Sequence, residues 1–152
     1  MDYYSQTPHD HKHHFNLSFM TTKILVNRRS IQLLRVLASG IFLVAGFGHI
    51  LNTQETVARI EQANFKGIAY YFGDPSWLVI ASGIVMLIAG FSFLIGYKTK
   101  WAALALIAVL IPITLTVQIG QINTLGPLFK NMAILGALLF FVLNNFDNNT
   151  IK

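Results

Sequence analysis

Four long apolar stretches without an acidic residue limit what this chain can fold into. They cover residues 31–51, 77–97, 101–119 and 125–143. Each has about 20 residues, the length that a helix needs to cross a hydrocarbon core roughly 30 Å thick. None alternates between polar and apolar positions, and a helix satisfies its own backbone hydrogen bonds in lipid. The sequence therefore predicts an all-α membrane protein, built as an antiparallel bundle of four transmembrane helices.

The composition excludes most soluble and all thiol-based classes of protein. Charged residues make up 11% of the chain, against roughly 25% in ordinary globular domains. Cysteine is absent, so disulfides, cysteine-ligated metals and dithiol redox relays are excluded within this chain. The length of 152 residues allows one domain. We expect a disordered polar tail at 1–30, the membrane domain at 31–145 and a short cytoplasmic tail at 146–152.

Lysine and arginine are distributed unevenly between the two sides of the predicted bundle. The N-terminal segment, the second loop with Lys98 and Lys100, and the C-terminus share one side. The other side has only Arg59, Lys66 and Lys130. By the positive-inside rule, both termini are cytoplasmic, and the first and third loops face outward. This topology explains the net charge of +5 without a nucleic-acid partner.

The first outer loop is long enough to contain structure of its own. Thr53 is a predicted cap for a short helix that runs to about residue 65, with Gly67 as its stop. Glu55 lies near the positive end of that helix, four residues before Arg59. We predict an interfacial helix on the outer membrane surface. It serves either as a lid over the bundle or as part of a binding site.

Small residues in the spans are spaced to let helices approach closely. They are Gly40, Gly46 and Gly48 in the first span, Gly83 and Gly90 in the second, and Ala133 and Ala137 in the fourth. This pattern predicts a compact bundle and a face for a homodimer. Pro112 removes a backbone donor in the middle of the third span and predicts a kink there.

Polar residues gather at the outer level of the predicted bundle. They are His49, Gln118, Gln121, Lys130 and Asn131. An ionisable group at membrane depth costs a few kcal/mol unless it is paired, hydrated or able to snorkel. A cation, an imidazole and amides suit a quinone carbonyl or a small anion. The sequence thus predicts a ligand pocket in the outer leaflet, and the alternative is ordinary solvation of the helix ends.

The sequence offers little catalytic machinery. Residues 75–145 contain no aspartate or glutamate, so the last three spans lack a carboxylate for acid–base work. We assign no catalytic residue and no metal ligand. The weak alternative is metal binding by clustered histidines near the N-terminus, which also fit a solvated tail. These are His9, His11, His13 and His14, and a start at Met20 would remove them.

Three segments of the chain resemble the DoxX family of bacterial four-helix membrane proteins. They are residues 33–51, 82–104 and 128–141. The residues that match the pattern of that family are Arg35, Gly46, Gly83, Gly90, Lys98, Lys130 and Asn131. The chain departs from the pattern at His49, where many relatives have lysine, and at Ile80, where many have an acidic residue. The family is similar to the DoxD-type subunit of thiosulfate:quinone oxidoreductase.

The resemblance implies a protein of the bacterial cytoplasmic membrane, linked to quinone-dependent redox metabolism or a stress response. On this basis we expect a non-catalytic accessory subunit or scaffold beside a membrane or periplasmic redox partner. The alternatives are a quinone-binding subunit of an oxidoreductase and a small-molecule permease. A quinone is the one cofactor that the resemblance favours.

Reporter domains fused to the two ends of the chain test the predicted topology. Four crossings with a cytoplasmic N-terminus return the C-terminus to the cytoplasm. A reporter that works only in the cytoplasm should therefore be active at both ends, and one that works only outside should be inactive at both. Activity of the outside reporter at either end would contradict this topology.

Overall fold

The computed structural model describes residues 27–120 and 122–144, which are almost entirely helical. The elements are α1 (Arg28–Leu51), α2 (Thr53–Glu61), α3 (Lys66–Phe72), α4 (Pro75–Ile95), α5 (Thr99–Val117), the 3-10 turn η1 (Ile122–Thr124) and α6 (Leu125–Leu143). Four of these helices, α1, α4, α5 and α6, are long and apolar enough to cross a membrane. The predicted all-α fold with four spans is confirmed. The histidine tract, Gln121 and the tail at 146–152 lie outside the described residues.

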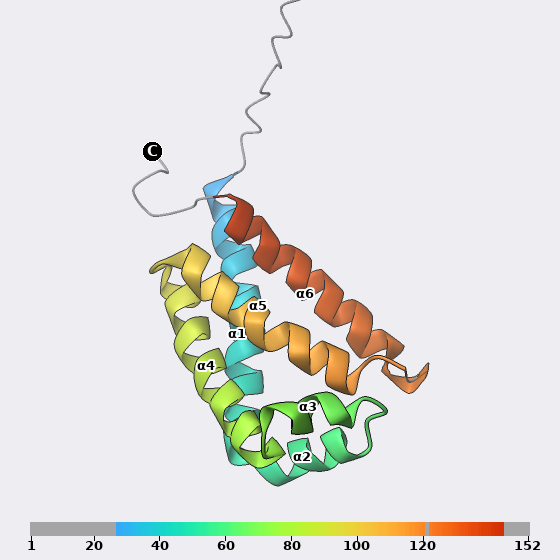
Figure 1. Cartoon of the computed structure of the whole chain (residues 1–152). Helices are drawn as coiled ribbons and strands as arrows, with labels where there is room; N and C mark the ends of the chain where they lie inside the picture. Colours follow the sequence, from blue (N-terminus) through green and yellow to red (C-terminus); the bar gives the residue numbers. More distant parts are fainter. Residues whose placement is uncertain (1–26, 121, 145–152) are drawn as a thin grey trace, which may run out of the picture.

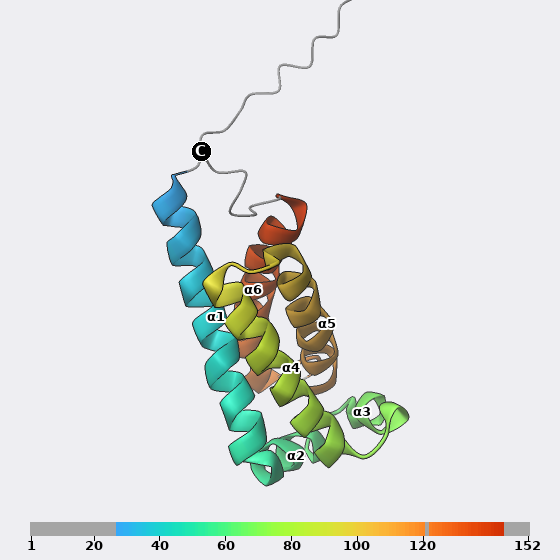
Figure 2. The same ribbon diagram turned by 90° about the vertical axis from the view of Figure 1, so that its left-hand side faces the viewer.

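The four long helices run antiparallel to their neighbours along the chain (Figure 1). α1 packs along α4, α4 along α5 and α5 along α6, whereas α1 and α6 meet over a much smaller surface. The start of α1 and the end of α6 lie at one end of the bundle, and α2 and α3 lie across the other. Turned by 90°, the bundle shows α4 between α1 and α5 (Figure 2). The weak α1–α6 contact leaves one side of the bundle open.

Side chains and prolines set where the first and second spans begin. Asn27 accepts a hydrogen bond from the backbone N–H of Arg29 at 2.9 Å and caps α1. Asp74 caps α4 in the same way through the N–H of Ser76 at 2.7 Å, with Pro75 in the first turn. Both helices therefore start a few residues before the apolar stretches that predicted them.

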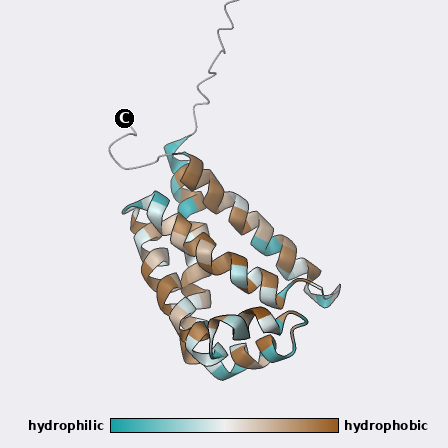
Figure 3. Cartoon of the chain, viewed as in Figure 1, coloured by the Kyte–Doolittle hydropathy of each residue, from teal (hydrophilic) through white to brown (hydrophobic). Residues whose placement is uncertain are grey.

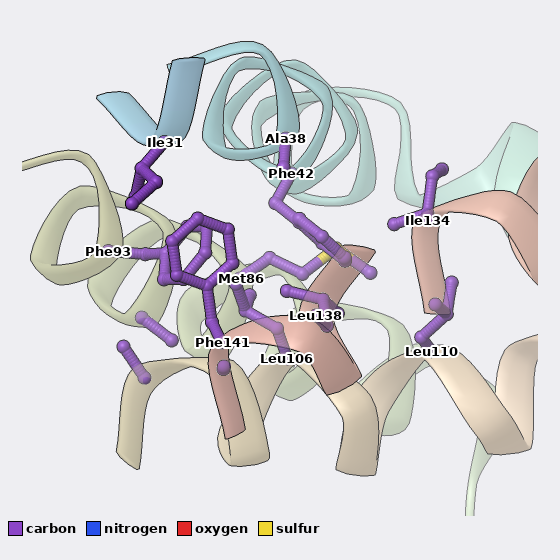
Figure 4. Packing of buried hydrophobic residues seen from close by; sticks show 13 residues of the cluster. Ile31, Ala38, Phe42, Met86, Phe93, Leu106, Leu110, Ile134, Leu138 and Phe141 are labelled. Carbon is purple, nitrogen blue, oxygen red and sulfur yellow. The ribbon is translucent and has the colours of Figure 1, made fainter. Parts of the chain in front are cut away.

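The core is built from aromatic and aliphatic side chains that meet at the centre of the bundle (Figure 4). Phe93 of α4 and Phe141 of α6 pack edge to face, with ring centroids 4.8 Å apart. Leu106 of α5 and Leu138 of α6 are fully buried beside them. Interdigitated side chains of this kind fix the relative position of the helices.

The long helices are apolar along most of their length (Figure 3), and many of their large apolar side chains are exposed. Val44 on α1, Ile88 on α4 and Phe129 on α6 are each more than two-thirds exposed. Soluble monomers rarely expose apolar surface this extensive. The exposed side chains thus fit a lipid environment.

A very close helix–helix approach lies between Gly46 of α1 and Gly83 of α4. A Cβ atom on Gly83 would lie 3.0 Å from the carbonyl oxygen of Gly46 and 3.0 Å from the Cβ atom of His49. A Cβ atom on Gly46 would lie 3.0 Å from the carbonyl oxygen of Gly83. Neither position has room for a side chain, so these two glycines set the spacing of α1 and α4.

The other small residues do not all share this role. A Cβ atom on Gly90 would make ordinary contacts with α1, whereas a Cβ atom on Gly40 or Gly48 would have no neighbouring atom within 4 Å. Ala133 is exposed and Ala137 is half-buried. The prediction of close approach was therefore wrong for Gly40 and Gly48, because a Cβ atom at either position would meet open space.

The loop between the first and second spans contains two short helices instead of one. α2 ends at Glu61, and α3 begins at Lys66, so Gly67 lies inside a helix and does not end one. Thr53 does not cap α2. Its hydroxyl donates to the carbonyl of His49 at 2.8 Å instead, because α1 ends just before it and leaves that carbonyl without a helical partner. The predicted pairing of Glu55 with Arg59 is present, at 2.6 Å.

Arg35 lies against the turn between α4 and α5 at the other end of the bundle. Gly96 ends α4 in the left-handed conformation, with φ of 78°. The guanidinium of Arg35 occupies the space that a side chain at Gly96 would need. Lys98 also has a left-handed backbone conformation and directly precedes α5. These residues shape the predicted cytoplasmic turn, at the opposite end of the bundle from α2 and α3.

Alanine at Gly83 should destabilise the bundle, whereas alanine at Gly136 should not. The added methyl group at Gly83 forces α1 and α4 apart, at a cost of about 1–3 kcal/mol. Gly136 of α6 has open space at the same position. Thermal unfolding of both variants in the same detergent gives the comparison. Equal melting temperatures would contradict the close approach of α1 and α4.

Candidate ligand cavity

A cavity of about 340 Å³ opens between α1, α5 and α6, beside α2, in the half of the bundle that is predicted to face outward. His49 of α1, Gln118 at the end of α5, and Lys130 and Asn131 of α6 all line it. Phe42, Met86 and Ile134 provide apolar wall. The structure thus brings together four of the five predicted site residues from three separate helices. The fifth, Gln121, lies outside the described residues.

Asn131 is held by a hydrogen-bond relay that ends on the backbone of α5. Its side chain is 6% exposed. The amide nitrogen Nδ2 donates to the hydroxyl of Thr114 at 2.9 Å, and that hydroxyl donates to the carbonyl of Leu110 at 2.7 Å. Since a hydroxyl has a single hydrogen to donate, Thr114 cannot also donate to Asn131. The relay therefore fixes Nδ2 toward Thr114 and leaves Oδ1 as a free acceptor.

His49 is held by a second relay, which ends on the backbone of α4. Its Nδ1 atom lies 2.8 Å from the hydroxyl of Ser82, and that hydroxyl donates to the carbonyl of Val79 at 2.8 Å. The hydrogen between Nδ1 and Ser82 must then come from the imidazole. A neutral ring with a hydrogen on Nδ1 keeps Nε2 as an acceptor.

Lys130 is the one cation at the cavity without a carboxylate partner among the described residues. Arg59 and Glu55 also line the cavity, but they pair with each other at 2.6 Å on the outer face of α2. Lys130 is exposed and makes no ion pair in the described part of the chain. The cavity therefore carries one uncompensated positive charge, which favours an occupant with oxygen acceptors.

Gln118 directly follows α5 and lines the cavity. Its side-chain oxygen is buried and has no hydrogen-bond partner among the described residues. A buried polar atom of this kind costs stability unless a ligand or water satisfies it.

A second cavity of about 330 Å³ lies on the other side of His49, between α3, α4 and α5. Its walls are mostly apolar, with Phe72, Val85 and Val109 among them, and Pro112 also lines it. The side chains that border both cavities are His49, Thr56, Ile113 and Val117. His49 thus sits in a wall between a polar and an apolar space.

Sequence reasoning missed the two hydroxyl residues that orient the site. Ser82 and Thr114 each lie inside a long apolar stretch, where a hydroxyl must find a partner within the protein. Their placement indicates that each hydroxyl group has a hydrogen-bond partner, but it does not identify the side chain on another helix that bonds to it. Glu55 and Arg59 were predicted for the loop helix and not for the cavity. Arg35 and Lys98 lie at the opposite end of the bundle and take no part in it.

No group of three metal-binding side chains gathers in the described ranges 27–120 and 122–144. The histidines proposed as a weak alternative lie outside those ranges.

Comparison with known proteins gives one match. The family model described as DoxX matches residues 30–119, which is more than half of the chain. The matched part contains most of α1 and all of α2 to α5. It includes His49 and Gln118, whereas Lys130 and Asn131 follow it. No curated protein and no solved structure matches the chain.

Replacing Thr114 with valine should destabilise the bundle, whereas replacing it with serine should not. Valine keeps the shape but removes the acceptor for Asn131, leaving a buried amide unsatisfied at a cost of about 1 kcal/mol. Serine retains the relay. The measurement is thermal unfolding of the two variants in one detergent. A valine variant as stable as the serine variant would show that the relay is not formed.

Proposed function

We propose that this chain, which belongs to the DoxX family, is an accessory membrane subunit that holds the head group of a quinone or quinol in the outer cavity. The single observation that supports this is the convergence of an unpaired lysine, an imidazole and two amides on one cavity between three helices. Groups of this kind on an apolar background are typical of sites for small, mostly apolar ligands.

The residues present fit a quinone head group. Such a ring has an apolar face and two oxygens, and a bound quinone would supply a carrier for two electrons. Lys130 would donate to one oxygen, and Asn131 and His49 would lie beside the ring. Phe42, Met86 and Ile134 would pack against its face. Helices α1, α5 and α6 would thus share the ligand between them.

The cavity offers no free carboxylate to deliver protons. Glu55 is the only acidic residue that lines it among the described residues, and Arg59 already pairs with it. The electron donor or acceptor would then be a partner protein in the membrane or outside it. This gives the chain a binding role in the cytoplasmic membrane, with both termini on the cytoplasmic side and the cavity at the outer leaflet.

Titration of the purified protein with a soluble benzoquinone head group tests the proposal. The probe is 2,3-dimethoxy-5-methyl-1,4-benzoquinone or its hydroquinone, and calorimetry in detergent measures the dissociation constant. The change Lys130→Met should weaken binding about tenfold, because a hydrogen bond from a charged donor is lost. Lys100→Met is the matched control, since Lys100 is exposed at the opposite end of the bundle.

Two results would overturn the proposal. One is the absence of saturable binding of either redox form to the wild-type protein. The other is equal weakening by Lys130→Met and Lys100→Met. Displacement of the probe by millimolar sulfate alone would instead identify the occupant as a small anion.

A further inference from the structure

We infer that the cavity binds the reduced form, the quinol, more tightly than the quinone. This inference rests on the proposed function and names the redox state of its ligand. It follows from which hydrogen-bonding atoms the protein leaves free, since the two redox forms differ in that respect. A quinone has two carbonyl oxygens that only accept, whereas a quinol has two hydroxyl groups that also donate.

The first free atom is Oδ1 of Asn131. Nδ2 is committed to Thr114 at 2.9 Å, and the hydroxyl of Thr114 is committed to Leu110 at 2.7 Å. Turning the amide around would place Oδ1 against a hydroxyl whose hydrogen is already used. The amide therefore offers its oxygen, and not its nitrogen, to a ligand in the cavity.

The second free atom is Nε2 of His49. Ser82 gives its hydrogen to Val79 at 2.8 Å and so accepts from Nδ1 of His49, also at 2.8 Å. The neutral ring then has an acceptor at Nε2. Because the bond to Ser82 uses Nδ1, Nε2 stays available to a ligand.

Two independent relays thus leave one free acceptor on each of two side chains that line the cavity. One relay joins α5 and α6, and the other joins α1 and α4. In both, a backbone carbonyl accepts the single hydrogen of the hydroxyl group, so that hydroxyl group can only accept from Asn131 or His49. If a quinone carbonyl faced Oδ1 of Asn131 or Nε2 of His49, two acceptors would meet with no hydrogen between them and no water to satisfy them, which costs free energy. A quinol hydroxyl can donate to either acceptor, while its own oxygen accepts from Lys130.

The test compares the two redox forms of one head group. The hydroquinone of 2,3-dimethoxy-5-methyl-1,4-benzoquinone, kept under argon, and the quinone itself are titrated against the full chain in detergent. We expect the hydroquinone to bind about tenfold more tightly, as one net hydrogen bond is gained. The midpoint potential of the bound head group should rise correspondingly by about 30 mV.

Variants of the two relays test whether the preference for hydroquinone depends on the orientation of Asn131 and His49 or only on their presence. Thr114→Val and Ser82→Ala leave Asn131 and His49 in place but free them to turn, so each should reduce the preference for hydroquinone to about threefold or less. Thr114→Ser should keep the wild-type preference. Ser92→Ala is the control for Ser82→Ala, since the hydroxyl of Ser92 bonds to Tyr97 at the opposite end of α4.

The outcomes distinguish this inference from the proposed function. Binding of both forms with equal affinity, or tighter binding of the quinone, would overturn the preference and leave the quinone site intact. A preference unchanged in both Thr114→Val and Ser82→Ala would show that the relays do not set it, and would overturn the inference as well. Absence of binding of both forms would overturn the proposed function itself.

Discussion

Polar side chains inside the spans must find their hydrogen-bond partners within the protein, and this constraint shapes the cavity. Asn131 and His49 each hydrogen-bond to a hydroxyl group on another helix. Each of these hydroxyl groups donates to a backbone carbonyl of the helix that carries it. In lipid, an amide or imidazole without such a partner would cost several kcal/mol. The relays therefore stabilise the helix packing and orient the cavity at the same time.

Helix packing and the chemistry of His49 depend on the same contact. Gly46 and Gly83 let α1 approach α4 so closely that a Cβ atom at Gly83 would lie 3.0 Å from the Cβ atom of His49. Ser82 is the neighbour of Gly83, so the approach that excludes a side chain at Gly83 also brings Ser82 to the imidazole at 2.8 Å. A larger residue at this crossing would therefore disturb the ring as well as the helices.

The sequence predicted the spans and the gathering of polar residues, because both follow from the length of apolar stretches and from alternating helix direction. His49, Gln118, Lys130 and Asn131 share a level in any antiparallel bundle of these four helices. The rotation of each helix about its axis, however, depends on packing. Sequence reasoning could not distinguish Gly46, which faces α4, from Gly48, which faces open space. Thr53 was misassigned because its partner is the free end of α1, and a helix end is poorly located by hydropathy.

Under the proposed function, the arrangement of charge at the cavity lets the chain bind a ligand without catalysing its reaction. Arg59 pairs with Glu55 on α2, so Lys130 can donate to a ligand without a free carboxylate of the described residues beside it. The free acceptors at Asn131 and His49 are set by neutral relays and change little when a ligand enters. A site of this kind would, under the proposed function, stabilise one redox form through hydrogen bonds that are oriented before the ligand binds, and a partner protein would transfer the electrons. Under the proposed function, the bundle therefore acts on the equilibrium between quinone and quinol, and the partner acts on the rate.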